Sequence, residues 1–147
     1  MTTPRVFIVR HGETEWSLSG QHTGTTDLPL TANGEKRVRA TGRALVGNDR
    51  LIVPKQLSHI YVSPRSRAQR TLELLDIGCH DPFPWQLHGL PPEATRSAEE
   101  GEKHSTDARV SITGDIAEWD YGEYEGVTSK EIRGRRKEKG LSENWYV

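Results

Sequence analysis

Residues 6–16 read VFIVRHGETEW, a short apolar run followed at once by a polar, glycine-containing segment. A continuous apolar run such as Val6–Val9 is typical of a strand buried on both faces of a parallel sheet, and such strands present ligand-binding residues at their carboxyl ends. Arg10, His11 and Gly12 stand at that position. A neutral imidazole attacks phosphorus, a guanidinium holds two phosphoryl oxygens, and glycine lets the backbone approach an anion. The stretch therefore predicts a phosphate site at the end of a buried strand.

The chain that follows alternates between helix and strand signals. Residues 17–29 are rich in glycine and threonine and have no sustained period, which predicts a loop over the mouth of the site. Thr31 is a typical N-cap for an amphipathic helix over residues 32–46. The expected inner face of that helix carries Val38, Thr41 and Leu45.

A second strand and helix follow in the same order. Residues 60–62 predict a short strand, and Ser63-Pro64 supplies an N-cap followed by proline at the first helical position. The helix is expected to run to about residue 75, with Arg67 near its start and facing the strand ends. Its expected buried stripe is Ala68, Leu72 and Leu75.

The third strand and helix complete the pattern. Residues 109–113 predict a strand, and Thr128 with Glu131 forms a capping box for a helix that stops at Gly140. A repeated strand–helix order indicates an α/β fold with a parallel sheet.

The composition changes between residues 76 and 108. Four prolines and the charge run 99–103 interrupt this segment, which predicts a long irregular insertion, functional or disordered. We expect it to be disordered, with one end attached to the core. The residues expected to attach it are Phe83, Trp85 and Leu87.

Several ordered motifs carry a family resemblance. They are RHGETEW at 10–16, HTG at 22–24, DLPLT at 27–31 with Gly34, SPRSRA at 63–68 with Thr71, and EWDYGEYEG at 118–126. With these motifs the chain resembles the histidine phosphatase superfamily, which includes the cofactor-dependent phosphoglycerate mutases. Residues 19–24 and 118–122 are most similar to the fungal sedoheptulose 1,7-bisphosphatases. The resemblance spans about residues 5–75 and 109–145 and implies a three-layer sandwich with helices on both faces of a mostly parallel sheet.

The resemblance also implies a site. It makes His11 the nucleophile that forms a phosphohistidine, and Glu118 the acid that protonates the leaving oxygen and then activates water. Arg10 and Arg67 are implied to hold the phosphoryl group, and Arg67 is favoured over Arg65 because of its register with Ala68. The further implied phosphate ligands are Ser17, Thr23 and Gly24. Ser17 stands where the mutases carry asparagine, which makes mutase chemistry less favoured.

Each of these residues also has a plainer interpretation. An isolated Arg-His-Gly triplet would favour a histidine that merely ends a strand, and only the later motifs in order favour the phosphate site. For Glu118 the plainer alternative is an ordinary exposed glutamate. Burial beside Trp119 and Tyr121 would raise the pKa of Glu118 and the arginines would lower it, and the sequence does not decide between the two effects. Two nearby arginines are expected to depress the pKa of His11 below its usual value of about 6.5.

Members of the resembled family carry a second catalytic histidine after a later strand, in an Ala-His-Gly or Gly-His-Gly context. All six histidines of this chain precede residue 105. We therefore expect residues 1–147 to form a partial domain, incomplete at the C-terminus. The implied function is a phosphomonoesterase acting on a sugar phosphate, such as sedoheptulose 1,7-bisphosphate. The alternatives are a mutase-like enzyme, or a non-catalytic remnant that keeps an anion-binding mouth.

Composition narrows the class further. With 147 residues, 33% apolar positions and a net charge of −1, the chain suits one domain with a modest core. The charge gives no reason to expect nucleic acid or an anionic membrane as a partner, and no apolar stretch approaches the roughly 20 residues that span a bilayer. We expect a cytoplasmic protein. The lone Cys79 and the scattered histidines lack metal-ligand spacing, so neither a metal nor a cofactor is expected.

Overall fold

A parallel pair of strands organises the part of the chain that the structure describes. The structure is a computed structural model, and it describes residues 3–86 and 106–144. Strand β1 (His59–Val62) pairs in parallel with β2 (Arg109–Ile112), so that Ile60 lies opposite Val110. The two strands expected at these places are confirmed, as is the α/β class with a parallel sheet.

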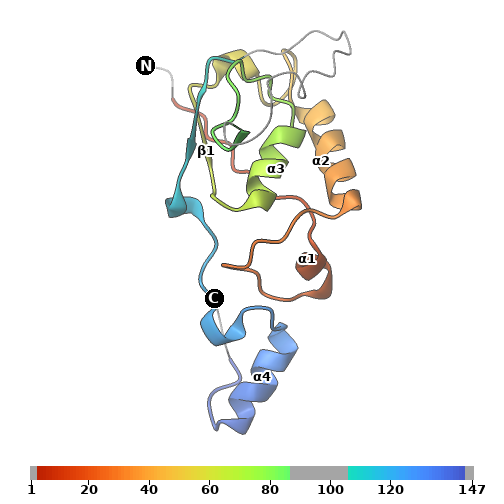
Figure 1. The fold of residues 1–147 in the computed structure, drawn as a ribbon, viewed down its shortest axis with the longest axis vertical. Coiled ribbons are helices and arrows are strands. Elements are labelled where there is room, and N and C mark those ends of the chain that lie inside the picture. Colours follow the sequence, from red (N-terminus) through yellow and green to blue (C-terminus); the bar gives the residue numbers. More distant parts are fainter. Residues whose placement is uncertain (1–2, 87–105, 145–147) are drawn as a thin grey trace.

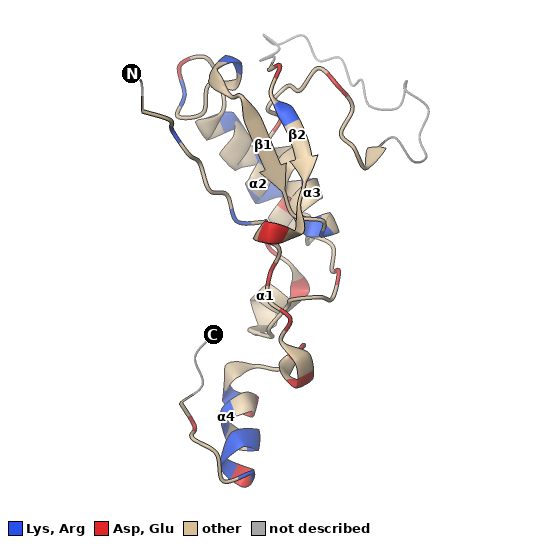
Figure 2. Ribbon diagram, turned by 90° about the vertical axis from the view of Figure 1, so that its left-hand side faces the viewer, with Lys and Arg blue, Asp and Glu red and all other residues tan. Residues whose placement is uncertain are grey.

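Two helices lie on one side of this sheet (Figures 1 and 2). Helix α3 (Ser66–Leu74) follows β1 and packs against it, and α2 (Ala32–Leu45) packs on α3. The remaining helices are α1 (Glu15–Ser19), α4 (Ser129–Glu138) and the short 3-10 helices η1 (Pro54–Gln56), η3 (Gly114–Ile116) and η4 (Gly122–Tyr124). The predicted loop over 17–29 therefore begins inside a short helix.

The buried face of α2 differs from the expected one. The N-cap is confirmed, since the Thr31 hydroxyl accepts a hydrogen bond from the Gly34 amide at 2.9 Å. The buried residues, however, are Gly34, Val38 and Gly42, whereas Leu45 is 38% exposed. A Cβ at position 42 would lie 2.6 Å from the carbonyl oxygen of Leu75. The helix meets the end of α3 through Gly42 and the backbone of Glu13 through Gly34, contacts that a search for apolar bulk overlooks.

The start of α3 was placed too early by the Ser63-Pro64 pattern. The N-cap is Arg65, and it makes no capping hydrogen bond with its side chain. Instead Asp27, from the loop before α2, accepts hydrogen bonds from the Ser66 amide and hydroxyl, both at 2.9 Å. A carboxylate at a helix N-terminus satisfies free amides and opposes the positive end of the dipole. Local sequence cannot reveal a cap supplied from 39 positions away.

The strand predicted over residues 6–9 is not formed. Val6 is 80% exposed, Ile8 94% and Val9 51%, and no strand ladder includes them among the described residues. Only Phe7 of this run packs against the core. Apolar composition indicates that a segment favours burial, but a strand forms only where a neighbour offers its backbone hydrogen bonds. The pair β1–β2 does not supply that neighbour.

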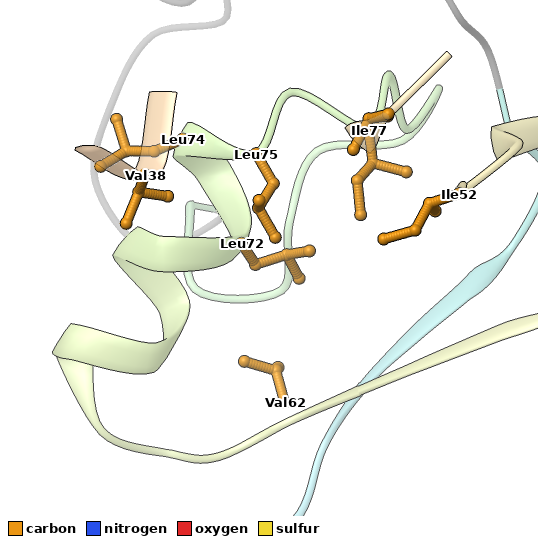
Figure 3. Packing of buried hydrophobic residues seen from close by; sticks show 8 residues of the cluster. Val38, Ile52, Val62, Leu72, Leu74, Leu75 and Ile77 are labelled. Atoms are coloured by element: carbon orange, nitrogen blue, oxygen red, sulfur yellow. The ribbon is translucent and has the colours of Figure 1, made fainter. Parts of the chain in front are cut away.

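The main hydrophobic core lies between the sheet and the helices (Figure 3). Its buried members are Val38, Val46, Ile52, Val62, Leu72, Leu74, Leu75 and Ile77. The start of the expected insertion does attach here: Phe83 and Trp85 pack against the core with ring centroids 4.8 Å apart. The Trp85 indole donates to Glu73 at 2.7 Å. Leu87 and the rest of the insertion up to residue 105 lie outside the described residues.

Helix α4 belongs to a second, smaller cluster at the far end of the molecule from the sheet (Figure 1). The predicted capping box is confirmed: the Thr128 amide donates to Glu131 at 2.9 Å, and the Glu131 amide donates back to the Thr128 hydroxyl at 3.3 Å. Gly140 follows the helix with φ +68°, as a glycine stop requires. Ile132 is fully buried against Tyr124 and Val127. None of the helices in residues 3–86 and 106–144 has the length and apolar character to cross a membrane.

Candidate active site

His11 presents one bare ring nitrogen. Its Nδ1 lies 2.7 Å from the carbonyl oxygen of Gly12, and because a carbonyl only accepts, Nδ1 carries the proton. The lone pair is then on Nε2. The pKa of His11 is lowered, first by burial of the half-buried ring and then by the charges of Arg67 and Arg10, while the Gly12 bond and Glu118 oppose the shift. The expected depression by arginines is present, but burial is the larger cause.

Two contacts fix the backbone around His11. The Gly12 amide donates to the Thr71 hydroxyl of α3 at 3.0 Å. The Glu13 carboxylate accepts from the Thr31 hydroxyl at 2.6 Å, and the Glu13 carbonyl accepts from the Thr31 amide at 2.9 Å. Hydrogen bonds from Thr31 and then Asn33 lower the pKa of Glu13. Glu13 is not among the predicted site residues, yet it ties the segment carrying His11 to the start of α2.

Arg67 is buried, with 2% of its surface exposed. Its guanidinium donates to three backbone carbonyls of the segment that we call the 23–26 loop: those of Thr26 at 2.8 Å, Gly24 at 3.2 Å and Thr23 at 3.3 Å. Burial is the main cause that lowers the pKa of Arg67. Arg67 lies close enough to His11 for its charge to lower the pKa of the imidazole. The neighbouring Arg65 differs from Arg67, because its Nε is buried without a hydrogen-bond partner.

Arg10 and Glu118 flank His11 from more exposed positions. The charges of both act on the imidazole, Arg10 lowering its pKa and Glu118 raising it. The Glu118 carboxylate accepts from the Tyr121 hydroxyl at 3.0 Å and from the Trp119 amide at 3.3 Å. Burial, followed by this bond to Glu118, raises the pKa of Tyr121 to about 12. Glu118 is exposed and Trp119 is 69% exposed, so the burial that the sequence left open for Glu118 is absent.

The Ser17 hydroxyl is engaged within α1. It donates to the Thr14 carbonyl at 2.8 Å and accepts from the Thr14 amide at 2.9 Å, as part of the capping box that starts the helix. Ser17 also lines a cleft of about 410 Å³ together with Arg10, His11 and Arg37. Its single hydroxyl proton is therefore donated to the Thr14 carbonyl, whereas the resemblance implied a bond to phosphate.

The 23–26 loop is held by a residue that the motifs did not single out. Glu125 accepts the Gly24 amide at 3.0 Å through each oxygen and the Thr26 amide at 2.9 Å. The Gly24 amide is therefore donated within the protein, whereas it was expected to face a phosphate. A Cβ at Gly24 would collide with the Trp119 carbonyl, so only glycine fits there. The Thr23 hydroxyl lies 3.4 Å from the Gln21 carbonyl.

The charged side chains of the described residues indicate which ligands the candidate site could hold. Among them, no three histidine, cysteine, aspartate or glutamate side chains gather closely enough to hold a metal ion. The charges that act on the His11 ring are those of Arg67, Arg10 and Glu118, and Arg37 and Glu13 also line the cleft beside it. This arrangement can bind an oxyanion, offer it a neutral imidazole and exchange a proton with it.

The chain is similar to several known proteins. It is 39% identical, over 99% of its length, to sedoheptulose 1,7-bisphosphatase of Saccharomyces cerevisiae, and 32% identical, over 88%, to an acid phosphatase of Mycobacterium tuberculosis. It covers 46% of each relative, and so spans about half the length of the curated relatives that it matches.

A solved structure has a similar fold. An open-reading-frame product of Mycobacterium tuberculosis matches with a TM-score of 0.52 and 26% identity, over 93% of this chain and 50% of that one. The family model described as histidine phosphatase superfamily, branch 1, matches residues 6–88, which include His11 and Arg67. From this match and the arrangement around His11, the chain belongs to branch 1 of the histidine phosphatase superfamily.

Proposed function

We propose that the protein is a phosphomonoesterase that acts on a sugar phosphate through a phosphohistidine formed on His11. The observation that carries the proposal is the 2.7 Å bond from His11 Nδ1 to the Gly12 carbonyl. It leaves Nε2 unprotonated, and the lowered pKa keeps the ring neutral at neutral pH. A nucleophilic nitrogen beside two arginines matches the needs of phosphoryl transfer, in which charge on the phosphoryl oxygens must be stabilised.

The binding residues have distinct roles in this proposal. Arg10 is exposed and its side chain is available to the phosphoryl oxygens. Arg67 supplies a fixed positive charge, since the 23–26 loop already orients its guanidinium. Thr23 offers a hydroxyl at the loop surface, while Ser17 and Gly24 shape the walls through their backbone contacts.

The proposed reaction has two steps. In the first, the His11 Nε2 lone pair forms a bond to phosphorus, the ester P–O bond breaks, and Glu118 in its acid form gives its proton to the leaving oxygen. In the second, water attacks phosphorus, the N–P bond breaks, and Glu118 takes the proton from the water. The Tyr121 hydroxyl bonds one oxygen of Glu118, which leaves the other free to exchange protons with solvent or substrate.

The proposed substrate is sedoheptulose 1,7-bisphosphate or a similar sugar phosphate. This choice rests on the 39% identity to the yeast sedoheptulose 1,7-bisphosphatase. The local surroundings of His11 carry several positive groups for an anionic ligand, among them Arg10, Arg37 and Arg67.

The direct test is phosphate release by the purified full-length protein in the presence of a divalent-metal chelator. We expect release from sedoheptulose 1,7-bisphosphate and loss of this activity in His11→Ala. The matched control is His59→Ala, a histidine on β1 whose ring contacts Ser111 at 3.0 Å. Full activity of His11→Ala would refute the nucleophile, and conversion of phosphoglycerate isomers without net phosphate release would favour a mutase.

A further inference from the structure

Glu125 and Arg67 both form hydrogen bonds with the backbone of the 23–26 loop, Glu125 with its amides and Arg67 with its carbonyls. Glu125 accepts hydrogen bonds from the amides of Gly24 and Thr26. Arg67 donates hydrogen bonds to the carbonyls of Thr23, Gly24 and Thr26. Hydrogen bonds with one charged partner are shorter and about twice as strong as neutral ones. We call this arrangement the Glu125–Arg67 clamp.

The clamp joins distant parts of the sequence. Arg67 comes from α3, whereas Glu125 follows η4, about 100 positions after the loop that it holds. Backbone bonds reinforce the junction: the His22 amide donates to the Val127 carbonyl at 3.1 Å, and the Gly126 amide donates to the His22 carbonyl at 2.8 Å. Glu125 is the side-chain part of this junction.

The candidate acid is carried by the same segment. Glu118 lies seven positions before Glu125, and between them the Trp119 carbonyl abuts Gly24. The 23–26 loop therefore contacts Trp119 and Glu125 from this segment and Arg67 from α3. A shift of the loop would disturb its hydrogen bonds with Arg67 and its contact with Trp119, the residue after Glu118.

We propose that Glu125 is a positioning residue, whose carboxylate holds the 23–26 loop in the register that places Arg67 and Glu118 beside His11. The inference rests on the proposed function for its catalytic consequence, but the structural role stands on the contacts themselves. Burial alone would raise the pKa of Glu125, but hydrogen bonds from the amide and side chain of Thr26 and from the Gly24 amide, together with the charge of Arg67, lower that pKa. The residue is therefore held as the anion that the two amides require.

Three variants separate this role from general damage. Glu125→Ala removes both acceptors, and Glu125→Gln keeps one carbonyl oxygen while it loses the charge. The matched control is Glu123→Ala on the same segment, because Glu123 bonds Lys139 at 3.0 Å and does not contact the loop. All are made in the full-length protein, and a thermal melt establishes that each is folded.

The first measurement is hydrogen exchange of single amides by NMR. We expect the Gly24 and Thr26 amides to exchange about tenfold faster in Glu125→Ala, as the loss of a net hydrogen bond predicts. Glu125→Gln should fall between, and Glu123→Ala should match the wild type. The Gly12 amide, which Thr71 holds, should stay protected in every variant. Unchanged exchange at Gly24 and Thr26 in Glu125→Ala would overturn the proposal, and if that variant fails to fold, the same criterion applies to Glu125→Gln.

The second measurement is turnover of p-nitrophenyl phosphate. Loss of the positioning carboxylate in Glu125→Ala should lower kcat about 10- to 100-fold with a smaller change in KM. The kcat of Glu125→Gln should lie between those of Glu125→Ala and the wild type. Wild-type kcat in Glu125→Ala, with exchange accelerated, would overturn the catalytic part. The proposed function is tested separately by His11→Ala: full activity there refutes the nucleophile, whereas unchanged exchange refutes the clamp.

Discussion

At the scale of single residues, the bond between His11 and the Gly12 carbonyl determines which ring nitrogen is left unprotonated. A carbonyl fixes the proton on Nδ1, and burial disfavours a second proton on the ring. The sequence predicts the arginines around His11, but burial is the larger cause of the lowered pKa. Burial depends on how α2 and α3 enclose residues 10–13, and no local pattern encodes that.

The titration of His11 gives a direct prediction. Its pKa is lowered from 6.5, so the folded protein binds fewer protons than the unfolded chain as the pH falls below 6.5. The contribution to stability is therefore present above pH 6.5 and is lost as the pH falls through the lowered value. NMR titration of the ring should give a midpoint below 6.5 in the wild type and a higher one in Arg10→Ala. A wild-type midpoint at or above 6.5 would contradict this.

Arg67 should not tolerate lysine. An ammonium is a compact charge that cannot reproduce a planar fork, and the three carbonyls of the 23–26 loop would lose part of their bonding. We expect Arg67→Lys to lower the free energy of unfolding by about 1–3 kcal/mol in urea titrations. Arg65→Lys is the control, because the Arg65 Nε has no partner to lose. Equal losses of unfolding free energy in Arg67→Lys and Arg65→Lys would contradict the special role of the Arg67 fork.

At the scale of elements, α2 and α3 meet through glycine. Gly42 lets the backbone of α2 approach the Leu75 carbonyl, which ends α3. Helix propensity alone would favour alanine over glycine inside a helix by about 1 kcal/mol. The close approach outweighs helix propensity here, because a methyl group 2.6 Å from the Leu75 carbonyl oxygen would force α2 and α3 apart.

Two glycine substitutions should therefore have opposite effects. Gly42→Ala is expected to lower the free energy of unfolding by about 1–3 kcal/mol, since overpacking outweighs propensity. Gly134→Ala in α4 meets nothing within 4 Å and should raise it by up to about 1 kcal/mol. Urea unfolding of both variants measures the difference. A stabilising Gly42→Ala would show that the helices separate more easily than the packing indicates.

The elements also show which signals are local. The Thr31 N-cap and the Thr128–Glu131 capping box were readable because each lies within four residues of the group that it satisfies. The cap that Asp27 provides for α3 was not, nor was the acceptor role of Glu125, since both partners are distant in sequence. The run 6–9 shows the reverse error: its composition predicts burial, but pairing depends on neighbours that the run cannot specify.

At the scale of the whole molecule, the described residues hold two separate apolar clusters. The larger joins the sheet, α2 and α3, and the smaller gathers Tyr124, Val127 and Ile132 around α4. Figure 2 shows α4 standing apart from the sheet, with many of its exposed positions occupied by lysine and arginine. The 23–26 loop and residues 118–128 connect the two, and Glu118 of the candidate site belongs to this connection.

A substitution in one apolar cluster should destabilise that cluster and leave the other stable. Ile132→Ala removes the fully buried side chain of the smaller cluster and should cost that unit about 2–5 kcal/mol. Hydrogen exchange should then accelerate in α4 while α3 stays protected, and Leu72→Ala should give the opposite result. Equal acceleration of both helices in both variants would mean that the two clusters unfold as one unit.

The central claim is that His11 carries the phosphoryl group. Its most direct test is mass spectrometry of the full-length protein, quenched at alkaline pH during turnover of sedoheptulose 1,7-bisphosphate, where phosphohistidine survives. We predict one added phosphoryl group on the peptide that contains His11, present in His59→Ala and absent in His11→Ala. Phosphate release with no modification at His11, or with a phosphoryl group on another residue, would contradict the account.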